Sequence, residues 1–222
     1  MKFCYPEINK VFDTSRSVVD TVIIENQNLL FSLIKDIKEQ IEGNDGKAVL
    51  SQDDKILPIS NNLECLSEFI PFDLNKRVLV NKANALLEQI ALQSDNYEST
   101  MQLLSSIEAF LLNTSFEMPG DIAFTKVNLT TLIKAVGLEF VDEYDSLAEK
   151  IIDYMELVRE YERDKLFITV NLRSYIDDSE MEKFMKTILQ HQIHLIMIEN
   201  REYERLPEED RYIIDSGLCE IS

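Results

Sequence analysis

Near the start of the chain, a segment rich in β-branched residues is followed by apolar residues at helical spacing. Residues 17–24 (SVVDTVII) are rich in β-branched side chains and bounded by polar residues, which predicts a buried strand. In residues 26–42, leucine and isoleucine recur every three or four positions, which predicts a helix directly after this strand. Either Asn26 or Asn28 can cap its first turn.

Short apolar runs also predict strands further along the chain. Residues 47–51 and 55–60 flank a polar turn and predict a hairpin. Residues 165–171 (KLFITVN) and 193–199 (IHLIMIE) are almost continuously apolar, as expected of central parallel strands, and residues 179–190 between them predict a helix. Strand, helix and strand in this order predict a right-handed crossover unit.

The middle of the chain has a different character, because its apolar residues recur at helical spacing. We expect helices near residues 61–70, 75–93, 96–113, 128–136 and 145–164. The predicted fold class is therefore α/β, with an α/β head domain formed by both chain ends, residues 1–60 and 165–222. A mostly helical domain, residues 61–164, interrupts it, and its last helix is expected to link the two regions.

Composition narrows the class of protein. The chain has 222 residues, 45% of them hydrophobic, with five glycines and five prolines, which is enough apolar material for one large or two small domains. No apolar stretch reaches the roughly 18 residues that a membrane span needs. The first ten residues contain Pro6 and Glu7 where a secretory signal would be apolar, so we expect a cytoplasmic protein.

Few residues suggest a metal centre or a disulfide. Cys4, Cys65 and Cys219 are odd in number and far apart, which predicts free thiols. His191 and His194 are the only histidines, and they are either paired metal ligands or residues favoured at a helix C-terminus. No third nitrogen or sulfur ligand lies nearby in the sequence, so zinc catalysis is not expected.

The turn between the first predicted strand and helix excludes a phosphate loop. Such a loop needs glycines, so that successive backbone N–H groups surround the anion, and a lysine that reaches the terminal phosphates. Residues 24–28 (IENQN) contain neither, and Glu25 places a carboxylate where phosphate would sit. We therefore expect no bound nucleotide and no ATP hydrolysis. No G-x-S-x-G elbow for nucleophilic catalysis is present either, and the protein is not expected to be an enzyme.

Four segments, in their order and separation, carry a family resemblance: FIPFDLN at residues 69–75, LIKAVGL at 132–138, KLFITVN at 165–171 and IMIENRE at 196–202. The chain resembles the small type II-A CRISPR adaptation proteins, ring-forming accessory factors of spacer acquisition. The resemblance spans most of the chain, roughly Val18 to Asp215.

The resemblance implies a homotetrameric ring that encloses double-stranded DNA and binds its ends without catalysis and without reading sequence. It also implies calcium ions that stabilise the ring, and a head domain similar to phosphate-loop ATPases but without the loop. The implied partners are the CRISPR integrase pair and the RNA-guided effector nuclease, in antiviral defence.

A net charge of −19, from 22 basic and 41 acidic residues, opposes DNA binding unless the positive groups are locally concentrated. A ring can achieve this by placing lysines on its inner wall and carboxylates elsewhere. The candidate DNA contacts nearest the helical domain are Lys76, Arg77, Lys82, Lys126 and Lys134.

Calcium prefers six to eight oxygen ligands, several of them carboxylates. The resemblance implies an acidic stretch before the LIKA-type helix, and here that stretch retains only Glu117 and Asp121. Glu139 and Asp142, just beyond the helix, are candidates to complete the site, and a plain surface loop is the alternative.

A second function fits the same fold and belongs to another class. The chain could be an acidic protein-interaction scaffold that does not bind DNA. Positive residues clustered on one face favour DNA binding, whereas scattered ones favour the scaffold.

Overall fold

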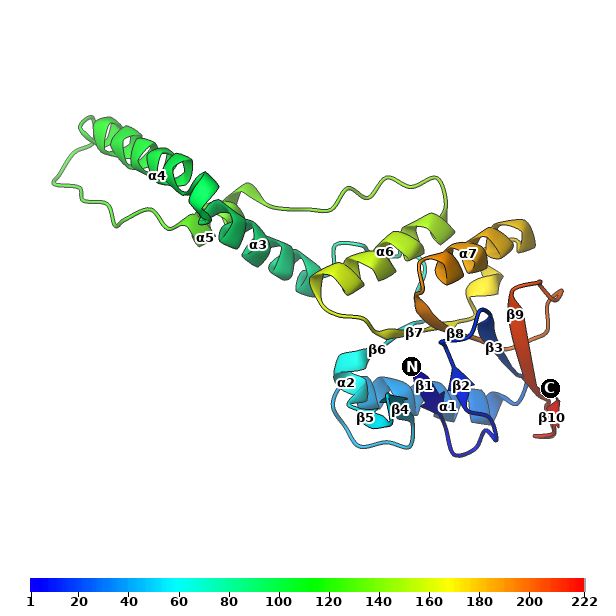
Figure 1. The fold of residues 1–222 in the computed structure, drawn as a ribbon. Coiled ribbons are helices and arrows are strands. Elements are labelled where there is room, and N and C mark those ends of the chain that lie inside the picture. Colours follow the sequence, from blue (N-terminus) through cyan, green and yellow to red (C-terminus); the bar gives the residue numbers. More distant parts are fainter. Residues whose placement is uncertain (222) are drawn as a thin grey trace. The chain divides into compact units, whose positions relative to one another are not determined.

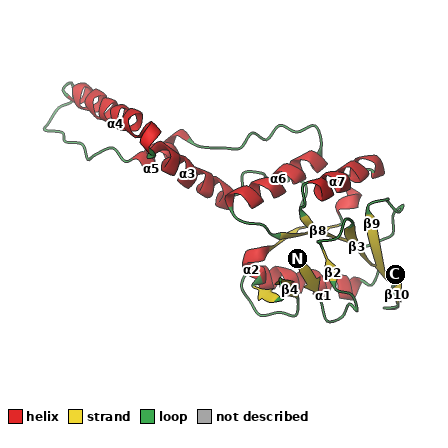
Figure 2. Cartoon of the chain, in the orientation of Figure 1, coloured by secondary structure: helices red, strands yellow, loops and turns green. Residues whose placement is uncertain are grey.

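The computed structural model describes residues 1–221 and divides the chain into two units (Figure 1). Unit 1 comprises Met1–Asp73 and Glu143–Ser222, and unit 2 comprises Leu74–Asp142. Residues 61–73 and 143–164, which helical spacing had placed in the inserted domain, therefore lie in unit 1. Figure 2 shows that all the described strands belong to unit 1.

Unit 1 is built on a six-stranded sheet that combines both ends of the chain. Its strand order is β10-β9-β3-β8-β7-β6, and all neighbours are parallel except β10 and β9. The strands are β3 (Val19–Ile24), β6 (Leu63–Leu66), β7 (Leu166–Val170), β8 (His194–Glu199), β9 (Glu209–Ile214) and β10 (Glu220–Ile221). The three strands predicted from continuous apolar runs, β3, β7 and β8, are confirmed, as is the parallel pairing of β7 with β8 across the intervening helix.

One predicted helix is wrong. Residues 61–70 do not form a helix, because the short α2 (Ile59–Asn62) ends there and β6 begins at Leu63. Leu63 and Leu66 are buried at a three-residue spacing, which is also typical of a helix. Residues 63–66 form a strand because they hydrogen bond to β7 at the edge of the sheet. The spacing of apolar residues in the sequence does not predict this pairing.

A second, four-stranded antiparallel sheet has the order β2-β1-β4-β5. The predicted hairpin is confirmed as β4 (Val49–Gln52) and β5 (Lys55–Leu57). Its partners β1 (Lys2–Cys4) and β2 (Phe12–Asp13) are too short to show a period in the sequence. The hairpin thus joins a separate sheet.

Helices cover both faces of the large sheet (Figure 1). On one face lies α1 (Gln27–Ile41), whose Leu29, Leu33 and Ile37 are buried in the same apolar cluster as alternate residues of β3, β7 and β8. On the other face lie α6 (Leu147–Tyr161) and α7 (Asp178–Gln190), which pack against each other. A 3-10 turn, η1 (Leu172–Ser174), follows β7. The helix that was expected to link the domains, α6, is part of unit 1.

Unit 2 contains three helices, α3 (Arg77–Ala91), α4 (Ser94–Ser115) and α5 (Leu129–Val136), and they confirm the helices predicted near 75–93, 96–113 and 128–136. No helix among the described residues is both long and apolar enough to cross a membrane.

After α4 the chain of unit 2 runs back beside its own helices. The Val127 N–H donates to Glu108 on α4 (2.9 Å), and the Phe140 N–H donates to Asn75, just before α3 (2.7 Å). Segment 116–140 therefore passes α4 first and the beginning of α3 last.

Candidate nucleic-acid interface

The two units differ sharply in charge. Residues 74–142 contain five Lys or Arg and eight Asp or Glu, a net charge of −3, and the remaining −16 of the chain's −19 belongs to unit 1. The five cations of unit 2 are the five candidate DNA contacts, Lys76, Arg77, Lys82, Lys126 and Lys134. The acidity that opposes DNA binding is therefore largely confined to unit 1.

The structure brings two of the five cations together. Arg77 is the first residue of α3 and Lys134 lies in the last turn of α5, and both line a cavity of about 290 Å³ between these helices. Lys76 precedes α3, Lys82 lies on α3 outside the cavity lining, and Lys126 lies in the loop before α5.

Four of these cations have no intramolecular counter-charge. Within residues 1–221, no carboxylate oxygen lies within 4.0 Å of the charged nitrogens of Arg77, Lys82, Lys126 or Lys134, and all four side chains are exposed. Binding an external phosphate would therefore break no ion pair of the folded chain.

Sequence reasoning missed the polar residues that complete the cavity. The lining includes Asn81, Asn84, Glu88 and Thr130. The Thr130 hydroxyl donates to the Glu88 carboxylate (2.6 Å), which ties α5 to α3. The signal was present in the sequence, since residues 81, 84 and 88 follow Arg77 at four, seven and eleven positions and so share its helix face.

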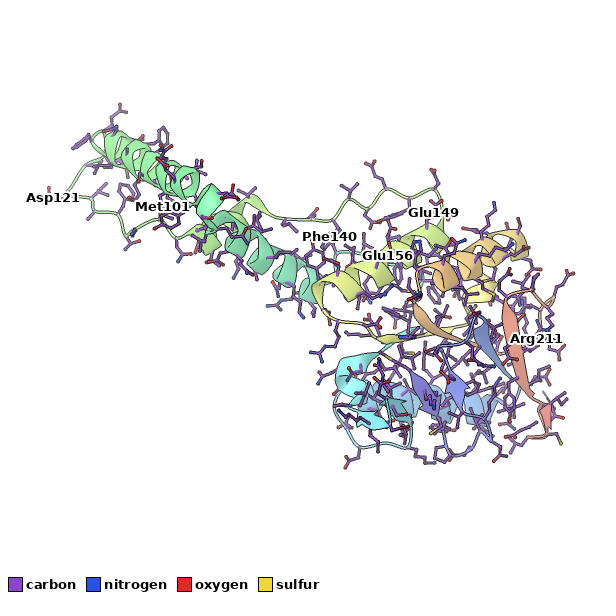
Figure 3. All side chains as sticks on the ribbon, viewed as in Figure 1. Met101, Asp121, Phe140, Glu149, Glu156 and Arg211 are labelled. Atoms are coloured by element: carbon purple, nitrogen blue, oxygen red, sulfur yellow. The ribbon has the colours of Figure 1, made fainter. Side chains whose placement is uncertain are left out.

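The four candidate calcium ligands are not brought together within one chain. Glu117 and Asp121 follow the end of α4, whereas Glu139 adjoins Phe140, which is hydrogen bonded beside the start of α3. Figure 3 shows Asp121 and Phe140 well apart in unit 2. In the part of the chain that the structure describes, no three His, Cys, Asp or Glu side chains form a group that could hold a metal ion. The residues of a single chain therefore do not fit a calcium site.

The helices and loops of unit 2 expose an unusual number of large apolar side chains. Phe110, Phe116 and Val136 are 67%, 78% and 80% exposed. Others are Val78, Leu86, Leu87, Ile90, Leu92, Tyr97, Leu103, Leu112, Met118, Phe124 and Val141. Apolar surface on this scale is typical of a surface that another chain covers.

The turn between β3 and α1 is occupied by the chain itself. The Glu25 N–H donates to the Ile214 carbonyl (2.9 Å), and the Asn26 side chain accepts from the Leu29 N–H (3.0 Å) as the predicted cap. The Asn26 amide also donates to the Ser216 carbonyl (3.0 Å). This turn forms no loop of inward-pointing N–H groups for a phosphate.

The two histidines have separate partners. His191 ends α7 and contacts Glu156 of α6, as expected of a residue at a helix C-terminus. His194 begins β8, where its Nδ1 lies 2.9 Å from the Thr14 hydroxyl and its Nε2 lies 3.3 Å from Asp164. They do not form a shared metal centre. The three cysteines are free, as predicted.

Unit 1 also contains a buried carboxyl that the sequence did not reveal. Glu199 ends β8 and is fully buried, its Oε1 accepts from the Arg173 N–H (3.2 Å), and its Oε2 has no hydrogen-bond partner among the described residues. The Arg173 guanidinium is directed to Asp178 (2.6 Å) and Glu209 (3.6 Å). Burial, opposed in part by Arg173, raises the pKa of Glu199 to about 7.

Comparison with known proteins accords with the resemblance in the four segments. A family model described as CRISPR-associated protein (Cas_Csn2) matches residues 40–218. A CRISPR-associated protein Csn2 from Streptococcus agalactiae is 21% identical over 221 residues, which cover 97% of this chain and 95% of the relative. One from Enterococcus faecalis is 21% identical over 206 residues, or 88% and 92% of the two chains. Because the family model matches well over half of its residues, the chain belongs to the Csn2 family of type II-A CRISPR adaptation proteins.

Proposed function

We propose that this protein binds double-stranded DNA, including its ends, without catalysis and without reading sequence, as a homotetrameric ring during CRISPR spacer acquisition. Family membership carries the role in CRISPR adaptation. The observation that carries the DNA-binding part is the charge distribution. Unit 2 has a net charge of only −3, and four of its cations, Arg77, Lys82, Lys126 and Lys134, have no carboxylate within 4.0 Å among residues 1–221.

Local charge matters more than net charge for such binding. Affinity for a duplex comes mainly from the counterions released when Lys and Arg neutralise phosphates. Charges further apart than the Debye length, about 8 Å at physiological salt, are largely screened. The carboxylates of unit 1 therefore oppose DNA only where they lie within that distance of it.

The exposed apolar side chains of unit 2 support self-association. Four copies arranged in a closed ring would cover such surfaces and would repeat each cation four times around one channel. Solution mass at several protein concentrations tests this assembly. A monomer at all concentrations would contradict the ring.

The topology of unit 1 supports a likeness to phosphate-loop ATPases that lack the loop. Its first parallel strand, β3, lies between β9 and β8 and leads into α1, where a phosphate loop would lie. The expected partners are the integrase pair and the RNA-guided effector nuclease, and the expected location is the cytoplasm.

Calcium enters the proposal only between subunits, because one chain does not bring the candidate acids together. If acids from two copies share an ion, a chelator should lower the solution mass, and Asp121→Asn should have the same effect. An unchanged mass and melting temperature in both cases would remove calcium from the ring.

DNA binding is tested by combining salt, topology and charge reversal. Affinity for linear DNA should fall by roughly 0.9 log units per log unit of salt for each phosphate neutralised, independent of sequence. Closed circles should bind poorly, because threading a ring needs an end. Lys134→Glu should weaken all duplexes alike, whereas Lys55→Glu on exposed β5 makes the same change in net charge and should not.

The acidic scaffold is the alternative outcome of this experiment. Equal weakening by Lys134→Glu and Lys55→Glu would show that only net charge matters. Equal binding of circles and linear fragments would exclude threading. Absence of DNA binding at low salt would leave the scaffold as the function.

A further inference from the structure

The cavity between α3 and α5 combines two cations from different helices. Arg77 begins α3 and Lys134 lies near the end of α5, and neither has a carboxylate within 4.0 Å in residues 1–221. The two positive charges beside the cavity repel each other. An anion bound between them would attract both and offset that repulsion. Because no carboxylate of the described residues neutralises Arg77 and Lys134, both cations are available to an external anion in this cavity.

Amide groups add hydrogen-bonding capacity beside these cations. Asn81 and Asn84 lie on the same face of α3 as Arg77. The Oδ1 atom of Asn84 is buried and has no hydrogen-bond partner among the described residues. A primary amide offers two N–H donors as well as this acceptor, so it can donate to a phosphate oxygen and accept from a water or a P–OH group.

The single acid in the lining does not neutralise the cations. The Glu88 carboxylate accepts from the Thr130 hydroxyl at 2.6 Å, and it is not within ion-pair distance of Arg77 or Lys134. The two cations and the amide donors therefore favour an oxyanion in this cavity.

We propose that this cavity is a phosphate-binding pocket in which Arg77 and Lys134 clamp one phosphate group and the amides of Asn81 and Asn84 orient it. The guanidinium of Arg77 provides planar, two-pronged donation, and the ammonium of Lys134 acts as a point charge. The identity of the biological ligand rests on the proposed function. In the ring, that ligand is a phosphate group of the DNA backbone. Free phosphate has the same chemistry and serves as the probe.

The test uses the full chain with inorganic phosphate, titrated at constant ionic strength against chloride and followed by calorimetry. Wild type should show saturable binding, and Arg77→Gln should reduce phosphate affinity about tenfold, as expected for losing charge-assisted hydrogen bonds. Lys55→Gln removes the same charge at an exposed position outside the cavity lining and should change affinity less than twofold. Asn84→Leu leaves net charge unchanged and should also weaken binding, with circular dichroism confirming the fold.

The results separate the pocket from the function. No saturable phosphate binding by wild type, or equal effects of Arg77→Gln and Lys55→Gln, would overturn the pocket. DNA binding that is insensitive to Arg77→Gln would overturn its assignment to DNA. Saturable phosphate binding that Arg77→Gln abolishes, without any DNA binding, would support the pocket and overturn the proposed function.

Discussion

Replacing Glu199 with glutamine is expected to remove a pH-dependent loss of stability that reaches about 3 kcal/mol at pH 8. The carboxyl is fully buried at the end of β8, and one of its oxygens has no hydrogen-bond partner among the described residues. Glutamine has the same shape and keeps an oxygen that can accept from the Arg173 N–H. The substitution therefore removes the buried charge while keeping the hydrogen bond at this position.

The magnitude and its pH dependence follow from the raised pKa. Folding raises the pKa of Glu199 from 4.5 to about 7, so the folded chain binds this proton more tightly than the unfolded chain. The protonated carboxyl carries no penalty below pH 4.5. Stability is lost as the pH rises from 4.5 to about 7 and the loss is complete above pH 7, where the difference corresponds to about 3 kcal/mol.

Urea unfolding followed by circular dichroism, at fixed protein concentration, measures this effect between pH 5.5 and 8.5. The stability difference between Glu199→Gln and wild type should shift in favour of the variant by about 2 kcal/mol from pH 5.5 to pH 8.5. Glu202→Gln, in the exposed loop after β8, makes the same charge change and should leave the pH dependence of wild type intact. A constant offset between Glu199→Gln and wild type across this range would refute the reasoning.

Three further predictions concern activity and stability. The pure protein should release no phosphate from ATP, because the β3–α1 turn lacks glycine and lysine, and saturable hydrolysis that is lost on mutating the turn would contradict this. Phe184→Ala should cost about 3–5 kcal/mol, since this buried α7 side chain leaves a cavity under the helix, whereas exposed Lys183→Ala should cost less than about 0.5 kcal/mol in the same urea titration. Asn26→Ala should cost about 1 kcal/mol by removing the cap of α1, and an unchanged urea midpoint would show that the cap contributes nothing.

The strands that the sequence predicts are those rich in apolar and β-branched residues. All residues of β3 and β7 are buried, as expected of central parallel strands. Strand β9 escaped prediction because it begins with Glu209 and contains Arg211, whose guanidinium pairs with that carboxylate (2.9 Å). A charged pair interrupts the apolar pattern by which a buried strand is recognised. The ion pair allows these two charged residues to lie within the sheet although neither is hydrophobic.

The sequence predicts which positive residues belong to the candidate site, but not which of them lie together. The five cations of unit 2 could be read from the sequence, since they are all the positive residues between 74 and 142. That Arg77 and Lys134 share a cavity depends on the chain folding back after α4, which no local pattern encodes. The same fold-back separates Asp121 from Glu139 within one chain, which sequence proximity to α5 does not reveal.

The position of β3 between β8 and β9 has a consequence for synthesis on the ribosome. Strand β3 is complete at Ile24, but both of its neighbours lie after residue 193. Translation proceeds at roughly 5–20 residues per second, so the neighbours of β3 and of the apolar face of α1 are synthesised on the order of 10–40 s after them. Unit 2 is contiguous in sequence and emerges in the interval. The nascent chain therefore carries an unpaired strand, every residue of which is buried in the folded protein, for most of its translation. Truncation anywhere before β9 leaves the sheet of unit 1 incomplete.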